Sequence, residues 1–282
     1  LGVETGIIAL TKKDLVDEDW LQLVTIDVEE LVKGTLLENS SIYAVSAETG
    51  EGLEELVESL DRMLINSQVK RDIGRPRLPI DRVFTVSGFG TVVTGTLIDG
   101  SLRAGQDVIL APSGNKARIR GLQTHKRKET VAEPGTRVAA NISGIDQNEI
   151  MRGEVLTSPG WLRPSEAFDV RLKVLPEAPK ELRHNMFVTL HTGSSETVTK
   201  LRLLEGDVLE PGVSGWAQMK PESPLPVVKG DYFVIRSNMT TLGGGSVVEP
   251  HAKRHRRRHK PTLQRLETLE LGTSEDIVFN TI

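Results

Sequence analysis

The spacing of apolar residues predicts alternating strands and helices in the first part of the chain. Residues 6–10 form a short, wholly apolar run, which is typical of a strand buried on both faces. Acidic residues from Asp17 to Asp19 mark the start of a helix that ends near Gly34. The side chains expected to form the buried stripe of this helix are Trp20, Val24, Val28 and Leu31.

The same strand–loop–helix order recurs in residues 42–64. A second strand covers residues 42–45, the loop 46–52 follows it, and an apolar stripe then indicates a second helix. This stripe comprises Leu53, Leu56, Val57, Leu60 and Leu64. Two successive units of this kind predict part of an α/β domain with a parallel sheet, which we place in residues 1–72.

From about residue 75 the period of the pattern changes to two. Apolar residues at 117, 119 and 121 share one face of a run in which Arg118 and Arg120 occupy the other. Residues 138, 140 and 142 repeat this alternation, and turn signals recur every 8–12 residues or so. The spacing predicts an antiparallel β-barrel over residues 75–160, with a boundary at Pro159–Pro164.

A second all-β segment is predicted for residues 165–250. Its clearest strand runs from Phe168 to Val174, where apolar residues alternate with Asp169, Arg171 and Lys173. Further strands are expected around residues 188–190, 216–219 and 232–235, and the segment is expected to end at the glycines 243–245. Leucines at 263, 266 and 269 then begin a helix within the last region, 251–282, for which we expect no complete packing.

Composition limits the classes of protein that need to be considered. With 38% hydrophobic and 26% charged residues, and without an apolar run of about 20 residues, the chain is expected to be globular rather than membrane-spanning. The absence of cysteine excludes disulfides and thiolate metal sites. Because the first residue is Leu1 and not methionine, we expect the chain to begin inside a domain.

Charge is distributed unevenly along the chain. The formal net charge is only −4, yet the segment from His251 to Lys260 holds six Lys or Arg residues, three His and no acid. Since local charge sets the field that a partner meets, this segment is a candidate for contact with nucleic acid. A solvated linker is the alternative interpretation.

Two loops of the α/β segment carry candidate ligand-binding residues. Each follows a predicted strand, and ligands of open α/β sheets bind at the carboxyl ends of the strands. The Asp14 carboxylate can accept two hydrogen bonds from the ring N–H and the amine of guanine, and the Lys12 stem can lie along the base. The Ala47 N–H can donate to the guanine carbonyl while Ser46 fixes the loop. Each pattern alone is common, but together they favour a guanine site.

The sequence Gly88-Phe89-Gly90 is a weaker candidate for binding phosphate. A phosphate-binding loop requires a helix behind it, whereas β-branched residues follow at 91–94 and predict a strand. We therefore interpret these glycines as a tight bend of the barrel. No Gly-x-x-x-x-Gly-Lys-Ser/Thr sequence is found, so the chain alone is not expected to hydrolyse GTP, and no catalytic or metal-binding residue is assigned.

These motifs resemble those of a known family. Residues 11–14 (TKKD) and 46–50 (SAETG) resemble the fourth and fifth guanine-nucleotide motifs of translational GTPases, with Thr11 in place of the usual Asn. Residues 81–96 look like the opening of the second domain of these factors, and Phe89 and Thr96 make this string most similar to selenocysteine-specific elongation factors. Residues 190–193, 233–236 and 241–245 are similar to the third domain of that family.

The resemblance implies a fold, partners and site residues. It implies the tail of a GTPase domain, two β-barrels and the start of a winged-helix region, in a cytoplasmic and monomeric factor that binds GTP with Mg²⁺. It also implies delivery of selenocysteyl-tRNA to the ribosome and contact with a messenger RNA hairpin. The aminoacyl pocket would comprise Asp81, Arg82 and Arg137. The candidates for RNA contact are His191, Arg236, Lys253, Arg254, Arg256, Arg257 and Arg258.

Other interpretations of the same residues remain open. Arg82 and Arg137 could be ordinary charges on the rim of a barrel, and Asp81 could bind the α-amino group or hold one of the arginines in position. A general elongation factor of the Tu type would carry ordinary aminoacyl-tRNAs, but such a chain would end near Gly245. A non-enzymatic β-barrel binding module is the alternative from another class.

Overall fold

A computed structural model describes residues 3, 5–66 and 72–271 of the chain. They belong to two compact units, one within residues 2–71 and one from residue 72 onward. The smaller unit contains β1 (Ile8–Thr11), a short 3-10 helix (Lys13–Leu15), α1 (Glu18–Val32), β2 (Ile42–Val45) and α2 (Leu53–Asn66). Strands β1 and β2 run parallel, as the sequence predicted, with Ile8 opposite Ile42 and Thr11 opposite Val45.

The helix α1 begins as predicted but does not bury its apolar stripe. The Asp17 carboxylate accepts a hydrogen bond of 2.9 Å from the Trp20 N–H and so caps the helix. However, the Trp20 side chain is 56% exposed and that of Leu31 is 79% exposed, while Val24 and Val28 are only half-buried. The prediction of a buried stripe is therefore wrong for the described chain, because a two-stranded sheet covers too little of the helix surface.

The larger unit begins with an antiparallel barrel, which confirms the predicted fold class. Its strand order is β10 (Arg137–Ser143), β4 (Gly90–Thr96), β3 (Arg77–Val86), β11 (Val155–Thr157), β6 (Asp107–Ala111) and β7 (Lys116–Thr124), and pairing of β7 with β10 closes it. The strand β8 (Arg127–Glu129) extends β7 as a hairpin, and β5 (Leu102–Arg103) pairs with β9 (Val131–Ala132). A 3-10 helix (Gln147–Glu149) precedes β11.

One face assignment in this barrel was wrong by one residue. Ala117 and Ile119 are buried as predicted, but the next core position is taken by Leu122 and not by Gly121. The register between β7 and β10 shifts here, since Asn141 pairs with Gly121 and Ile142 pairs with Ile119. The skipped residue forms a β-bulge, which reverses the faces of the residues that follow.

A second closed barrel follows in the same unit. Its strand order is β12 (Phe168–Val174), β17 (Ser214–Pro221), β15 (Ser195–Leu203), β14 (Phe187–Thr192), β18 (Tyr232–Ser237) and β19 (Thr240–Glu249). The short strands β13 (Leu182–Arg183) and β16 (Val208–Leu209) pair outside it. The glycines 243–245 lie inside β19, so the prediction that they end the segment is wrong. Glycine is required at position 245 because a Cβ there would lie 1.8 Å from the Arg171 carbonyl oxygen on the neighbouring strand.

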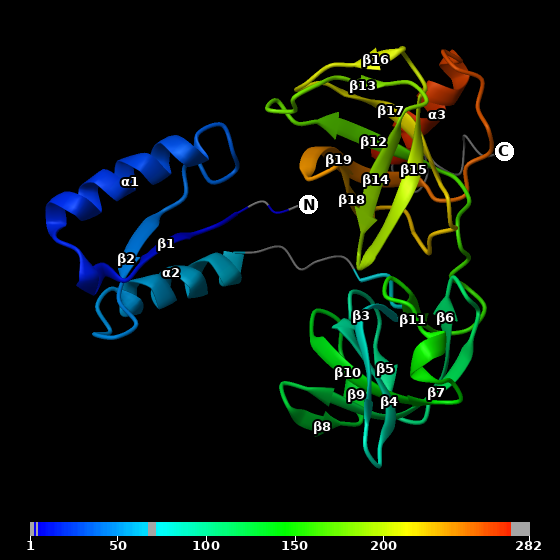
Figure 1. Ribbon diagram of the computed structural model, residues 1–282, viewed down its shortest axis with the longest axis horizontal. Coiled ribbons are helices and arrows are strands. Elements are labelled where there is room, and N and C mark those ends of the chain that lie inside the picture. Colours follow the sequence, from blue (N-terminus) through cyan, green and yellow to red (C-terminus); the bar gives the residue numbers. More distant parts are fainter. Residues whose placement is uncertain (1–2, 4, 67–71, 272–282) are drawn as a thin grey trace. The chain divides into compact units, whose positions relative to one another are not determined.

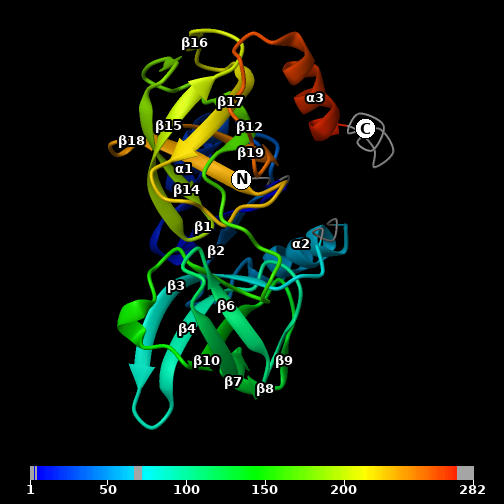
Figure 2. The ribbon, with the colours of Figure 1, turned by 90° about the vertical axis from the view of Figure 1, so that its right-hand side faces the viewer.

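The end of the described chain packs against the second barrel. Helix α3 (Lys260–Leu271) lies beside the second barrel (Figure 2). Its Leu266 side chain is buried in a cluster with Leu204, Trp216 and Val248. The expectation that this helix lacks complete packing is therefore wrong within the described residues. The remainder of the predicted winged-helix start, residues 272–282, lies outside the described residues.

The two barrels contact each other through polar groups. Arg77 of β3 lies between Asp99 of the first barrel and Asp231, which directly precedes β18 of the second. At the β14–β15 turn, the Ser195 hydroxyl donates a 2.6 Å hydrogen bond to the Gly153 carbonyl oxygen of the first barrel. Figure 1 shows this hairpin directed towards the first barrel.

Candidate functional site

The two loops of the predicted guanine site meet in the smaller unit. The Ser46 side chain is 0% exposed, and its hydroxyl donates a 2.5 Å hydrogen bond to Oδ1 of Asp14. The same hydroxyl accepts hydrogen bonds from the backbone N–H groups of Glu48, at 3.2 Å, and Thr49, at 3.1 Å. Ser46 therefore orders its own loop and orients the Asp14 side chain. Asp14 itself is exposed to solvent.

The remaining predicted residues lie beside this pair. Thr11 is the last residue of β1, and Lys12 follows it in a left-handed conformation with φ of 64°. Lys13 and Glu51 join the two loops through an ion pair of 2.6 Å. Thr11, Lys12, Asp14, Ser46 and Ala47 are thus gathered at the carboxyl ends of two adjacent parallel strands. Their assignment to guanine stays a prediction.

A cluster of three charged residues lies on the outer face of the first barrel. The Arg137 guanidinium binds the Asp81 carboxylate through both Nη atoms, and Nη2 lies 2.9 Å from Oδ1. The Thr94 hydroxyl, on the strand between them, donates to Oδ1 at 2.9 Å. Arg82 stands opposite Thr94 in the β3–β4 register, is exposed, and contributes to the field at Asp81. The structure therefore brings all three predicted pocket residues together.

The charges in this cluster determine its protonation. Partial burial raises the pKa of Asp81, but hydrogen bonds from Arg137 and Thr94 and the positive charges of Arg137 and Arg82 outweigh burial. The pKa of Asp81 therefore lies below its ordinary value. Two guanidiniums and one carboxylate leave one uncompensated positive charge.

An apolar hollow of about 550 Å³ begins close to this cluster and was not anticipated from the sequence. Phe84, Val86, Phe89, Val92 and Leu122 contribute its apolar lining. Phe84 lies two residues beyond Arg82 on β3, so the two side chains share a face about 7 Å apart. The exposure of Phe84 and Phe89 was not predictable, because alternation alone does not show which face of a barrel strand is left uncovered.

The basic segment after β19 is attached to the second barrel. Arg257 and Arg258 both bind the Asp207 carboxylate, and Arg257 also donates to the Gly206 carbonyl oxygen at 2.6 Å. The hydrogen bond from Arg257 is the main cause that lowers the pKa of Asp207. Interpretation of the whole segment as a solvated linker is therefore wrong, since these arginines fasten it in place.

A buried acid anchors the same segment and was missed by the sequence reasoning. Asp169 is 0% exposed, and its carboxylate contacts His255 Nε2 at 2.5 Å and Gln218 Nε2 at 3.0 Å. Gln218 also donates to the Lys253 carbonyl oxygen at 2.9 Å. Burial raises the pKa of Asp169, and the charge and hydrogen bond of His255 and the hydrogen bond of Gln218 only partly offset this.

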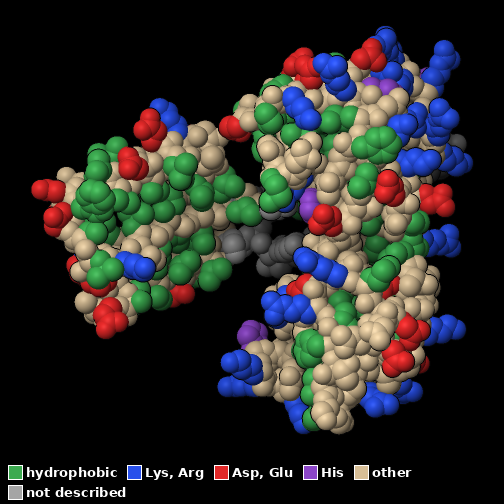
Figure 3. Space-filling model, in the orientation of Figure 1, with side chains coloured by type: hydrophobic (Ala, Val, Ile, Leu, Met, Phe, Trp, Pro, Cys, Tyr) green, Lys and Arg blue, Asp and Glu red, His purple; other side chains and the backbone are tan. Residues whose placement is uncertain are grey.

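The other candidates for RNA contact differ in their surroundings. His191 lies 3.8 Å from Glu196, and Arg236 donates to the Met239 carbonyl oxygen at 2.7 Å. Lys253, Arg254 and Arg256 are exposed, and none has an acidic partner among residues 72–271. Figure 3 shows Lys and Arg side chains gathered over the second barrel and the segment that follows it.

Comparison with known proteins first defines the class of the fold. Residues 90–157 match the family model "Elongation factor Tu domain 2", which covers most of the first barrel. Residues 169–254 match the model "Selenocysteine-specific elongation factor, beta-barrel domain", which covers the second barrel and the start of the basic segment. Both barrels are therefore similar to domains of translation elongation factors.

Relatives over the whole chain make the identification more specific. A selenocysteine-specific elongation factor of Desulfomicrobium baculatum is 42% identical over 99% of this chain, and that of Haemophilus influenzae is 31% identical over 93%. The chain is thus a homologue of the selenocysteine-specific elongation factors. It covers 44% and 41% of the length of these two relatives.

Solved structures agree on the fold. The crystal structure of a bacterial selenocysteine-specific elongation factor EF-Sec superimposes with a TM-score of 0.83 at 24% identity, over 99% of this chain and 45% of that one. The apo form of translation elongation factor SelB from Methanococcus maripaludis gives a TM-score of 0.75 at 25% identity, over 86% of this chain and 58% of that one. A further structure of that factor holds the GTP analogue GppNHp. Within the described ranges, no helix has the length and apolar character needed to cross a membrane.

Proposed function

We propose that this chain is the tRNA-holding part of a GTP-dependent factor that delivers selenocysteyl-tRNA to the ribosome. The observation that carries this proposal is the cluster of Asp81, Arg82 and Arg137 on a barrel of the elongation factor Tu type. Homology to selenocysteine-specific elongation factors over nearly the whole chain supports it independently.

The net positive charge of the cluster favours selenocysteine over its close analogues. A free thiol titrates at about 8.5, so cysteine is mostly neutral at pH 7. A selenol is more acidic and is mostly ionised, whereas the hydroxyl of serine stays neutral. Guanidiniums remain charged at all relevant pH values, and Arg82 has no acidic partner among the described residues. A selenolate therefore gains attraction here that a hydroxyl does not.

We infer that Asp81 acts as a positioning residue for Arg137. Its carboxylate accepts two hydrogen bonds from Arg137 and one from Thr94, which fixes the guanidinium on the barrel surface. This arrangement favours the second of the two roles that the sequence left open for Asp81. Arg82, by contrast, is free to approach the selenium atom.

The apolar hollow suits the nucleoside that carries the amino acid. An aminoacyl group is esterified to the terminal nucleoside of tRNA, so a pocket for that base must lie next to the aminoacyl pocket. The hollow that includes Phe84 and Phe89 meets this requirement, because it begins on the same face of β3 as Arg82. Its apolar lining is suited to the faces of a planar base.

The smaller unit would bind the guanine of GTP. Ser46 holds Asp14 at the edge where a base would enter, and the second carboxylate oxygen of Asp14 has no partner among the described residues. The phosphates and Mg²⁺ require groups that the printed sequence does not contain. Binding of guanosine and of adenosine to the wild type and to Asp14→Asn tests this assignment. Guanosine binding that is weakened by Asp14→Asn would support it, whereas equal binding of guanosine and adenosine would favour a degenerate module.

The broader setting follows from the same proposal. The factor acts in the cytoplasm as a monomer and takes part in recognition of a hairpin in messenger RNA. The concentration of cations in residues 251–260, next to a helix that packs on the second barrel, supports an RNA-bound extension there. A mass of one chain per tRNA in sedimentation of the complex checks the monomeric state.

Competition between two tRNAs tests the proposal. Binding of selenocysteyl-tRNA and of seryl-tRNA is measured for the wild type, Arg82→Gln, Arg137→Gln and the control Arg118→Gln, which alters an exposed pair elsewhere on the barrel. A hydrogen bond to a charged group contributes about 1.5–3 kcal/mol, so each pocket variant should lower the preference about 10-fold to 100-fold. An unchanged preference in both pocket variants refutes the proposal, and equal binding of ordinary aminoacyl-tRNAs indicates a general carrier.

A further inference from the structure

Asn141 lines the apolar hollow of the first barrel and makes a hydrogen bond that the proposed function does not use. It belongs to β10, where its ladder partners are Val92 of β4 and Gly121 of β7. A Cβ on Gly121 would have nothing within 4 Å, so the surface on that side of Asn141 is open. The side chain is therefore placed beside the hollow and outside the barrel core.

The Asn141 amide is bound to the turn between β3 and β4. Its Nδ2 donates a 2.8 Å hydrogen bond to the carbonyl oxygen of Phe89, a residue 52 positions earlier in the chain. Its Oδ1 is buried and has no hydrogen-bond partner among residues 72–271. A buried oxygen that is left unpaired in the protein costs stability. The stability of the barrel therefore does not explain why an amide stands at this position.

The turn lies beyond the ladder that joins β4 to β10. It comprises residues 87–89 and follows the last pair of the β3–β4 ladder, Val86 with Gly90. The Phe89 N–H closes it through a 2.9 Å hydrogen bond to the Val86 carbonyl oxygen. The β4–β10 ladder ends at the pair of Thr91 with Ile142. The hydrogen bond from Asn141 thus extends the connection between the hairpin and β10 past the end of the ladder.

The turn carries one wall of the hollow. Phe89 lines the hollow, yet its side chain is 57% exposed. Because so exposed a ring is not held by the packing of a core, its position depends on the backbone that carries it. Fixing the Phe89 carbonyl oxygen therefore fixes the residue whose ring forms the wall.

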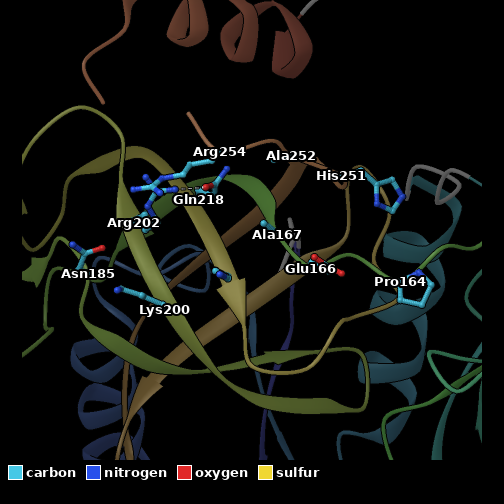
Figure 4. A pocket seen from close by; sticks show the side chains of 11 residues that line it. Pro164, Glu166, Ala167, Asn185, Lys200, Arg202, Gln218, His251, Ala252 and Arg254 are labelled. Atoms are coloured by element: carbon cyan, nitrogen blue, oxygen red, sulfur yellow. Dashed lines mark hydrogen bonds between the residues drawn. The ribbon is translucent and has the colours of Figure 1, made fainter. Parts of the chain in front are cut away.

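The position of a wall matters more in this hollow than in a charged one. The hollow of about 660 Å³ on the second barrel is lined by Lys200, Arg202 and Arg254 (Figure 4), and attraction between charges persists over several ångströms. Dispersion contacts, by contrast, lose about a quarter to a half of their strength when a gap of about 0.5–1 Å opens. The affinity of a planar ligand in the apolar hollow therefore depends on where the Phe89 ring stands.

We propose that Asn141 is a positioning residue, which holds the β3–β4 turn so that the Phe89 ring forms a fixed wall for the terminal nucleoside of tRNA. This inference rests on the proposed function, because that function places the nucleoside in the hollow. Asn141 acts through Phe89 and needs no contact of its own with the ligand. A purely structural Asn141 would instead support the stability of the barrel and leave nucleoside binding unchanged.

Binding of one tRNA with and without its terminal nucleoside tests the proposal. Neither RNA carries an amino acid, so the ratio of the two affinities isolates the nucleoside from the aminoacyl group and from the rest of the RNA. The variants are Asn141→Ala, Phe89→Ala and the double variant. The matched control is Asn115→Ala, because Asn115 lies outside the lining of the hollow and its Nδ2 also donates to a backbone oxygen of the same barrel, that of Glu149 at 3.4 Å.

The expected result is a loss of affinity for the complete tRNA alone. A neutral hydrogen bond changes an affinity about twofold to tenfold, so Asn141→Ala should lower the ratio by about that factor. Its affinity for the shortened tRNA and its midpoint of thermal unfolding should not fall, and Asn115→Ala should leave the ratio unchanged. In the Phe89→Ala background, Asn141→Ala should have no further effect, because the wall is already absent. Amide hydrogen exchange of residues 87–90 should be faster in Asn141→Ala than in the wild type.

Three outcomes would overturn the proposal. They are an unchanged ratio in Asn141→Ala, an equal effect of this substitution with and without the Phe89 ring, and unchanged exchange of residues 87–90. A wild type that binds both RNAs equally would show that the hollow does not hold the nucleoside, and that part of the proposed function would then fail together with this inference. The preference for selenocysteyl-tRNA over seryl-tRNA reports Arg82 and Arg137, so its failure is detected separately.

Discussion

Replacement of Arg77 by Gln should destabilise the larger unit and separate the unfolding of its two barrels. Arg77 joins the barrels through two carboxylates: Nε lies 2.8 Å and Nη2 2.5 Å from Asp99, and Nη1 lies 2.8 Å and 2.7 Å from the oxygens of Asp231. The side chains are 8%, 5% and 16% exposed for Arg77, Asp99 and Asp231. The variant therefore leaves two mostly buried carboxylates without their counter-ion.

The magnitude follows from that burial. Removal of one partner from a buried ion pair costs about 3–5 kcal/mol, because the remaining charge is left desolvated. Burial opposes the charged form of Arg77, but hydrogen bonds and charges of Asp231 and Asp99 outweigh it and raise the pKa of Arg77. At about 2–4 °C per kcal/mol for a unit of this size, the midpoint of thermal unfolding should fall by about 6–20 °C. Arg77→Lys should recover only part of this loss, since an ammonium cannot contact both carboxylates as a fork.

Urea unfolding followed by circular dichroism measures the effect, and Arg118→Gln is the matched control. Arg118 and Asp107 form an exposed pair of 3.8 Å in the first barrel, and pairs of this type contribute about 0–1 kcal/mol. A double-mutant cycle with Asp231→Asn isolates the contact between barrels. If Arg77→Gln costs no more than Arg118→Gln and one cooperative transition remains, the ion cluster does not join the barrels.

Three further predictions concern a glycine, an acid and a histidine. Gly245→Ala should destabilise the second barrel by more than about 2 kcal/mol in urea unfolding, whereas Gly121→Ala, with open space around its Cβ, should change stability by less than about 0.5 kcal/mol. The pKa of Asp81 is lower in the folded state than in the unfolded state, so its ion pair should stabilise the fold at pH values above the unfolded pKa of about 3.9. This stabilisation should be lost as the pH falls through the folded pKa. NMR of the Asp81 carboxyl carbon should report the lowered pKa, and Arg137→Gln should raise it. His255→Ala should release the basic segment, so that trypsin cleaves residues 253–258 faster than in the wild type, and equal cleavage would contradict the anchoring role.

The periodicity of the sequence predicted the strands and loops well, because whether a segment forms a strand depends mainly on residues close to one another in the chain. The alternation in residues 168–174 identified a barrel strand, and apolar runs before Lys12 and Ser46 placed two loops at one edge of a parallel sheet. The contact between Ser46 and Asp14 follows from that topology. Chemistry that depends on two adjacent strand ends is therefore accessible to sequence reasoning.

The features that could not be predicted depend on contacts between segments that are distant in the sequence. Alternation placed Asp169 on an outward face, yet the segment that returns after β19 covers that face and buries the carboxylate under His255. The basic run suggested free charge, but Asp207 neutralises part of it from a distant loop. The bulge that moves Leu122 into the core depends on pairing with β10, about 20 residues away in the sequence.

The two barrels of the larger unit carry different distributions of charge. On the first barrel, the pair of Asp81 with Arg137 leaves one excess positive charge, that of Arg82. The second barrel and the segment after it concentrate Lys200, Arg202, Lys220 and Arg254, which have no ion-pair partner among residues 72–271. Because Arg77 joins the barrels, the distance between these two charged surfaces is set by the protein, and an anionic ligand that reached both would lose less freedom at the second contact than at the first.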